Sequence, residues 1–111
     1  MIETLYLSAV TVAELRYGIA SMAGGRRRDT LHDRLEQEVL PLFEGRVLPF
    51  DLEAPGAFAD LMARAKVAGS AIAAADGYIA ATAVACGLIV ATRDTSPFEA
   101  AGLKTINPWQ L

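Results

Sequence analysis

The sequence contains very few of the residues that form disulfides or catalyse proton transfer at neutral pH. Its 111 residues include one cysteine and one histidine. One cysteine cannot form a disulfide within the chain, so a cytoplasmic setting is expected. We expect Cys86, in an apolar helical segment, to be a small buried residue. His32, which has charged neighbours on a helical pattern, is expected to face solvent.

Long uncharged segments are also missing. The longest apolar run, residues 77–92, has 16 uncharged residues and contains Gly87. A helix that spans a membrane needs about 20 such residues, so no membrane association is expected. The start, Met1-Ile2-Glu3, lacks the basic region and apolar core of a signal peptide.

Positive charge is scarce as well. Ten basic residues against 13 acidic ones give a net charge of −3. This balance argues against broad, nonspecific coating of nucleic acid. It does not exclude a nuclease, because a carboxylate pocket contributes negative charge itself. The local run Arg26–Arg28 is expected in an exposed loop.

Two aspartates flank the apolar run that is present. Its Ala-rich half, residues 77–86, favours a helix, and its β-branched half, residues 88–92, favours a buried strand. Asp76 is therefore predicted in the first turn of a helix, and Asp94 just beyond the carboxyl end of the next strand. Ligand sites of parallel α/β sheets collect at that end.

The first half of the chain begins with a predicted strand. Residues 5–10 form a short apolar run, and Thr11 and Glu14 match the capping box of a helix that reaches about Met22. A second helix, opened by Asp29 or Thr30, is expected to stop or kink at Pro41 and to end by Gly45.

The second half continues the alternation. Residues 46–50 are predicted as a strand, and Asp51 or Glu53 opens a helix with Pro55 in its first turn. After residues 70–96, we expect a loop or short helical turn over 97–102 and a last strand over 103–106. The alternation predicts a single domain, residues 1–111, of the three-layer α/β/α class with a mostly parallel sheet.

Three acids, Glu14, Asp76 and Asp94, stand at junctions between these elements. Each has a structural alternative: a capping box, a helix-dipole contact and an Asx turn, respectively. Gathered at one edge of a parallel sheet, they would repel one another unless a cation bound there. Oxygen ligands suit Mg²⁺ or Mn²⁺, and such a metal can activate water against a phosphodiester. Nearby hydroxyls that could orient a ligand are those of Ser8, Thr11 and Thr92.

Several segments together resemble a known family. The segments YLSAVTVAELRYGIA, RVLPFD, IAAADGYIAATA, VATRDTSPFEAAG and INPW are similar to the PIN-domain ribonucleases, specifically the VapC toxins and, among these, the FitB-like members. The resemblance implies a PIN-like α/β fold and Mg²⁺- or Mn²⁺-dependent cleavage of single-stranded RNA. It also implies a cognate antitoxin and a homodimer. It maps the catalytic and metal-binding acids onto Glu14, Asp76 and Asp94, with Arg16 and Arg93 as candidate RNA contacts.

The resemblance is incomplete at the start of the chain. Family members begin with a strand that ends in Asp-Thr-Asn, and no such motif precedes residue 5 here. We therefore expect a chain that lacks the first strand: either its natural start lies upstream of Met1, which we favour, or it is a genuine fragment.

Two other functions are compatible with the residues. One is a catalytically silent PIN fragment that binds an antitoxin or dimerises without cleaving RNA. The other is a receiver-like domain phosphorylated on an aspartate. The receiver reading is disfavoured because Lys104 lies inside the predicted last strand rather than at its end.

Overall fold

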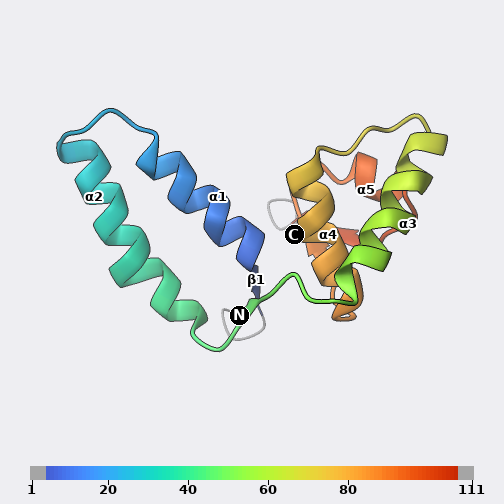
Figure 1. Ribbon diagram of the computed structural model, residues 1–111, viewed down its shortest axis with the longest axis horizontal. Coiled ribbons are helices and arrows are strands. Elements are labelled where there is room, and N and C mark those ends of the chain that lie inside the picture. The colour runs from blue at the N-terminus through green and yellow to red at the C-terminus, as the bar shows by residue number, and fades with distance from the viewer. Residues whose placement is uncertain (1–4, 108–111) are drawn as a thin grey trace. The chain divides into compact units, whose positions relative to one another are not determined.

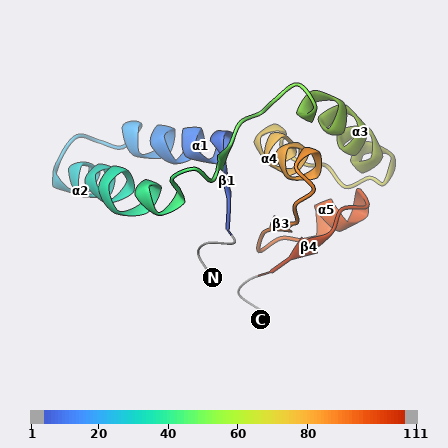
Figure 2. The same cartoon turned by 90° about the horizontal axis from the view of Figure 1, so that it is seen from below.

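The chain forms two compact units that divide between Pro49 and Phe50. The computed structural model describes residues 5–107. Among the described residues, the first unit contains two strands, two helices and two short helical segments. The second contains three helices and two strands (Figures 1 and 2). Helices alternate with parallel strands in both units, which confirms the predicted α/β class.

The first unit starts with β1 (Leu7–Ser8) and α1 (Ala9–Ala20). Ser8 caps α1, because its hydroxyl accepts a hydrogen bond of 3.0 Å from the Val10 N–H. The predicted cap at Thr11 is wrong: the helix begins earlier, which leaves Thr11 in its first turn and Glu14 in its second. The capping-box explanation of Glu14 therefore fails.

A second correction concerns Arg26–Arg28, which we expected in a loop. They form the first turn of α2 (Arg26–Arg34), which follows Gly25 without a side-chain cap, so neither Asp29 nor Thr30 opens this helix. In Figure 1, α1 and α2 lie side by side as a helical hairpin.

The end of this hairpin follows from one proline. The chain continues beyond α2 as a π-helix, η2 (Leu35–Val39), and then as a 3-10 helix, η3 (Leu40–Phe43), with Pro41 in its first turn. A proline cannot donate the i→i−4 hydrogen bond, which explains the change of helix type and confirms the predicted interruption. Gly45, at φ 77°, then turns the chain into β2 (Val47–Leu48).

Strands β1 and β2 pair in parallel. Leu7 lies opposite Val47, and Ser8 lies opposite Leu48. The Arg46 guanidinium donates hydrogen bonds to the carbonyl oxygens of Leu5 and Leu42, which ties both ends of the hairpin together.

The second unit is built on α3 (Ala54–Val67) and α4 (Ala74–Ala85), which pack closely. Pro55 lies in the first turn of α3, as predicted. At the contact, a Cβ added to Gly77 would lie 2.7 Å from Met62 Sδ and 3.0 Å from Phe58 Cε1. A larger residue than glycine here would therefore force the Met62 and Phe58 side chains to move. Around the contact, the buried core consists of Ala54, Leu61, Ala65, Ile72, Ala80, Ala81, Val90, Phe98 and Ala101.

The second parallel pair completes this unit. Strand β3 (Val90–Ala91) pairs with β4 (Thr105–Ile106), Val90 opposite Thr105 and Ala91 opposite Ile106, and α5 (Ser96–Ala100) connects them. The connection from strand through helix to parallel strand matches the predicted order. Asn107 and Pro108 were expected to end the last strand. Asn107 follows β4, and Pro108 lies outside the described residues.

Two further findings bear on the expectations from composition. Cys86 is exposed, because α4 ends at Ala85 and leaves the cysteine at the cap position; the predicted burial is wrong. In the part of the chain that the structure describes, no helix is long and apolar enough to cross a membrane.

Candidate active site

Two of the three candidate acids lie in the second unit, at the predicted positions. Asp76 is in the first turn of α4 and exposed, and Asp94 is exposed in the loop after β3. Both lie at ends of elements that the core holds in place. A carboxylate at the start of a helix also interacts favourably with the helix dipole.

A side-chain hydroxyl shapes the backbone around Asp94. Thr92 Oγ1 accepts a hydrogen bond of 3.3 Å from the Asp94 N–H, and Asn107 Nδ2 donates one of 3.2 Å to the Arg93 carbonyl oxygen. These bonds connect the loop after β3 with the end of β4. Thr92 thus supports the backbone that carries Asp94, one of the structural roles open to it from the sequence.

The start of α4 is fixed by packing. Gly77, next to Asp76, is buried against α3, and Ala80 and Ala81 follow it into the core. A helix held this closely cannot rotate without clashes at Gly77. The backbone of Asp76 therefore has a defined position, while its carboxyl group stays in solvent.

The third acid, Glu14, lies on α1 in the first unit and is exposed. Among residues 5–107, no three histidine, cysteine, aspartate or glutamate side chains are grouped so that they could hold a metal ion. The meeting of Glu14 with Asp76 and Asp94 therefore stays a prediction.

The ion pairs of the described residues leave the three acids unpaired. Arg16 binds Glu36, His32 binds Asp33, and Arg64 binds Asp60. The carboxylates of Glu14, Asp76 and Asp94 are in none of these pairs. Solvent-accessible carboxylates without a cationic partner are the donor type that Mg²⁺ and Mn²⁺ prefer.

The other predicted site residues have mixed positions. Ser8 uses its hydroxyl to cap α1, and Thr11 is half-buried in the same helix. Arg93 is exposed beside Asp94. Arg16 is exposed and held by two hydrogen bonds of 2.9 Å, from Nε and Nη2 to the two carboxylate oxygens of Glu36. The RNA contacts predicted for Arg16 and Arg93 stay predictions.

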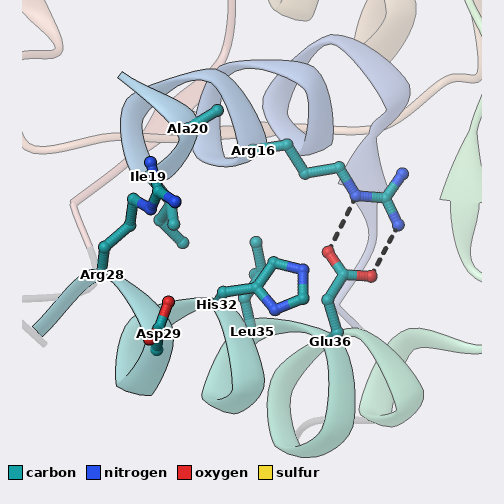
Figure 3. A pocket seen from close by; sticks show the side chains of 8 residues that line it. All are labelled: Arg16, Ile19, Ala20, Arg28, Asp29, His32, Leu35 and Glu36. Atoms are coloured by element: carbon teal, nitrogen blue, oxygen red, sulfur yellow. Dashed lines mark hydrogen bonds and ion pairs between the residues drawn. The ribbon is translucent and has the colours of Figure 1, made fainter. Parts of the chain in front are cut away.

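The Arg16–Glu36 pair closes one end of a groove between α1 and α2 (Figure 3). The groove has a volume of about 620 Å³ and is lined by Arg16, Ile19, Ala20, Arg28, Asp29, His32, Leu35 and Glu36. The hydrogen bonds from Arg16 lower the pKa of Glu36 and keep it ionised. The sequence did not predict this groove, because an ion pair between residues that are 20 positions apart leaves no local pattern.

The comparison with known protein families decides the classification. The model of the PIN domain matches residues 1–103, which covers parts of both units. The chain belongs to the PIN-domain family. The α/β fold described above is therefore a PIN-like fold, as the resemblance implied.

Two curated PIN-domain relatives are highly similar over nearly the whole chain. The VapC ribonuclease Y4jK of Sinorhizobium fredii is 69% identical over 110 residues, which cover 99% of this chain and 79% of the relative. The toxin FitB of Neisseria gonorrhoeae is 54% identical over 109 residues, which cover 98% of this chain and 78% of the relative.

A solved structure agrees with the sequence comparison. The structure of FitAB bound to an IR36 DNA fragment contains a chain that is 51% identical and superposes with a TM-score of 0.92. The match covers all of this PIN-domain chain and 78% of the other one. The two chains therefore share both their fold and about half of their amino acids.

Proposed function

We propose that this PIN-domain protein is a metal-dependent endonuclease for single-stranded RNA and the toxin component of a type II toxin–antitoxin system. The observation that carries the proposal is the 69% identity, over 99% of the chain, with a VapC ribonuclease. Similarity to the toxin FitB supports the same class. Asp76 and Asp94, together with Glu14, are the proposed catalytic and metal-binding residues.

The chemistry of these acids supports a divalent metal. Asp76 and Asp94 are exposed oxygen donors, and no ion pair within residues 5–107 neutralises them. A bound Mg²⁺ or Mn²⁺ supplies an activated water and stabilises the charge that develops on a phosphodiester. The protein's own part is to hold the carboxylates in place, through the packed start of α4 and the turn at Thr92.

The proposed partners follow from the similar proteins. A FitAB structure superposes on the chain, so a cognate antitoxin is the proposed protein partner. We further propose a cytoplasmic location, a homodimer, and a single PIN domain comprising both units. The resemblance to this family further leads us to propose that a form of the chain carrying an upstream segment that ends in Asp-Thr-Asn has an additional carboxylate at the site.

An RNA cleavage assay tests the proposal. The chain of 111 residues and a form extended by an upstream segment ending in Asp-Thr-Asn are incubated with a labelled single-stranded RNA. The assays contain Mg²⁺, Mn²⁺ or EDTA. We expect EDTA-sensitive cleavage by the extended form. The shorter chain should be slower by roughly 10²-fold or more, because loss of a ligand displaces the reacting groups.

Substitutions connect the activity with the proposed site. Asp76→Asn and Asp94→Asn should each lower cleavage by at least about 10²-fold. Asp60→Asn is the matched control: it removes the same charge from the same unit, but from a carboxylate already bound to Arg64. Activity unchanged in Asp94→Asn, or equally reduced in Asp60→Asn, would contradict the site.

The competing function is a silent PIN fragment that binds an antitoxin without cleaving RNA. Antitoxin binding by both forms of the chain, with no metal-dependent cleavage by either, would establish this alternative and overturn the nuclease.

A further inference from the structure

We propose that Arg26, Arg27 and Arg28 bind the phosphate backbone of single-stranded RNA. This inference rests on the proposed ribonuclease function and adds to it the surface that captures the substrate. The three guanidinium groups are consecutive and lie in the first turn of α2. We call them the arginine patch.

The side chains of the arginine patch face solvent or the groove. No hydrogen bond or ion pair joins its side chains to any residue in the described range 5–107. Arg26 and Arg27 are exposed, and Arg28 is half-buried along the groove between α1 and α2 (Figure 3). By contrast, Arg16 and Arg64 are each bound to a carboxylate. The patch therefore has donors available to a ligand.

The position of the arginine patch in α2 is also electrostatically unfavourable for the helix. The first turn of a helix carries the positive end of the dipole, where cationic side chains are unfavourable. Asp29 is the only acid in this turn, and Gly25 provides no side-chain cap. The dipole of α2 therefore does not favour three arginines at this end.

Charge identifies this ligand as a polyanion. The chain has a net charge of −3, and the proposed active site consists of carboxylates, which repel RNA. An RNA strand can be held only where positive charge is concentrated, and the patch contains three of the ten basic residues. Guanidinium groups pair with phosphate oxygens in a bidentate manner and do not read the base, so the contact is independent of sequence.

RNA binding by the Asp94→Asn chain, which should not cut its ligand, tests the patch. The dissociation constant for a fluorescent single-stranded RNA is measured at several salt concentrations, with and without Arg26→Gln/Arg27→Gln. We expect weaker binding by on the order of tenfold and a salt slope that is flatter by about 0.7 for each arginine removed. In the cleaving protein the same pair should raise KM and leave kcat unchanged.

Arg34→Gln provides the matched control. Arg34 is exposed in the last turn of the same helix, so this change removes one positive charge from α2, half of what the double variant removes, and none from the patch. Its effect should be at most about twofold, because a single distant charge is screened by salt. Arg28→Gln is measured separately, with a thermal melt, because this side chain also lines the groove.

The outcomes separate the two proposals. Cleavage and binding of RNA that are unchanged in Arg26→Gln/Arg27→Gln, or reduced equally in Arg34→Gln, would overturn the patch and leave the nuclease intact. Loss of antitoxin binding in the double variant, with normal RNA binding, would assign the patch to the protein partner instead. Absence of any RNA binding or cleavage in the unmodified chain and its extended form would overturn both.

Discussion

The two units differ in how their helices are held. In the second, nine side chains form a buried core, and α3 and α4 meet at Gly77. In the first, the buried side chains of the described residues are Ser8, Leu35 and Phe43, and α1 buries none. The first unit instead offers polar and basic side chains and a groove. We propose that the packed second unit holds the carboxylates of Asp76 and Asp94 in place, whereas the first unit, which carries Glu14, also presents the arginine patch.

The largest expected effect compares the packing of the two units through substitution of one buried leucine in each. Leu61, 1% exposed, lies at the centre of the second unit, and Leu35, 6% exposed, is buried in the first. Leu61→Ala should lower the free energy of unfolding by about 3–5 kcal/mol, and Leu35→Ala by about 2–3 kcal/mol. Urea unfolding measures both. A larger loss for Leu35→Ala would show that the first unit is the better-packed one.

Substitution of one glycine by alanine in each unit compares the packing of their helices, with smaller expected effects on stability. Gly77→Ala should destabilise the chain by about 1–3 kcal/mol, because its Cβ would overlap Met62 Sδ. Gly18→Ala, inside α1 with no atom within 4 Å of the added Cβ, should stabilise it by about 0.5–1 kcal/mol. Thermal melts of the two variants should move in opposite directions. Stabilisation by both substitutions would mean that helix propensity, not packing, dominates at Gly77.

The smallest expected effect concerns pH and the first unit. Hydrogen bonds from Arg16 hold the pKa of Glu36 below its usual value. A lowered pKa means that the ionised form stabilises the fold above the pKa of the unfolded state, about 4.3, and that this stabilisation disappears as the pH falls further. The protection factors of the α1 and α2 amides, which are corrected for the intrinsic pH dependence of hydrogen exchange, should therefore fall at acidic pH in the unmodified chain. In Glu36→Gln this part of the pH dependence should be missing; an unchanged profile would argue against the pair.

Local signals in the sequence were sufficient for most of the second unit. Pro55 and Gly87 each mark the boundary of an element, and the Ala-rich run before Gly87 is a helix. The positions of Asp76 and Asp94 at element ends followed from these boundaries. The strands of this unit, β3 and β4, were predicted too long, because an apolar run in the sequence does not show where the hydrogen-bonded pairing of strands stops.

The first unit was harder to predict because several of its signals compete. Ser8 and Thr11 are both good N-caps, and the capping-box pattern favoured Thr11, whereas the structure uses Ser8. A run of three arginines suggests a loop, yet the contact between α1 and α2 makes it helical. Whether Glu14 joins the two aspartates depends on how the units meet, which no local pattern encodes.

The exposed thiol at the end of α4 makes the arrangement of the units measurable. Cys86 is the only cysteine of the chain, so one spectroscopic probe can be attached to the second unit without any substitution. A second probe at an exposed position on α1, such as an introduced cysteine in place of Tyr17, would complete a distance pair. The distance between the probes, with and without Mn²⁺ or RNA, would report directly whether ligands draw the two units together.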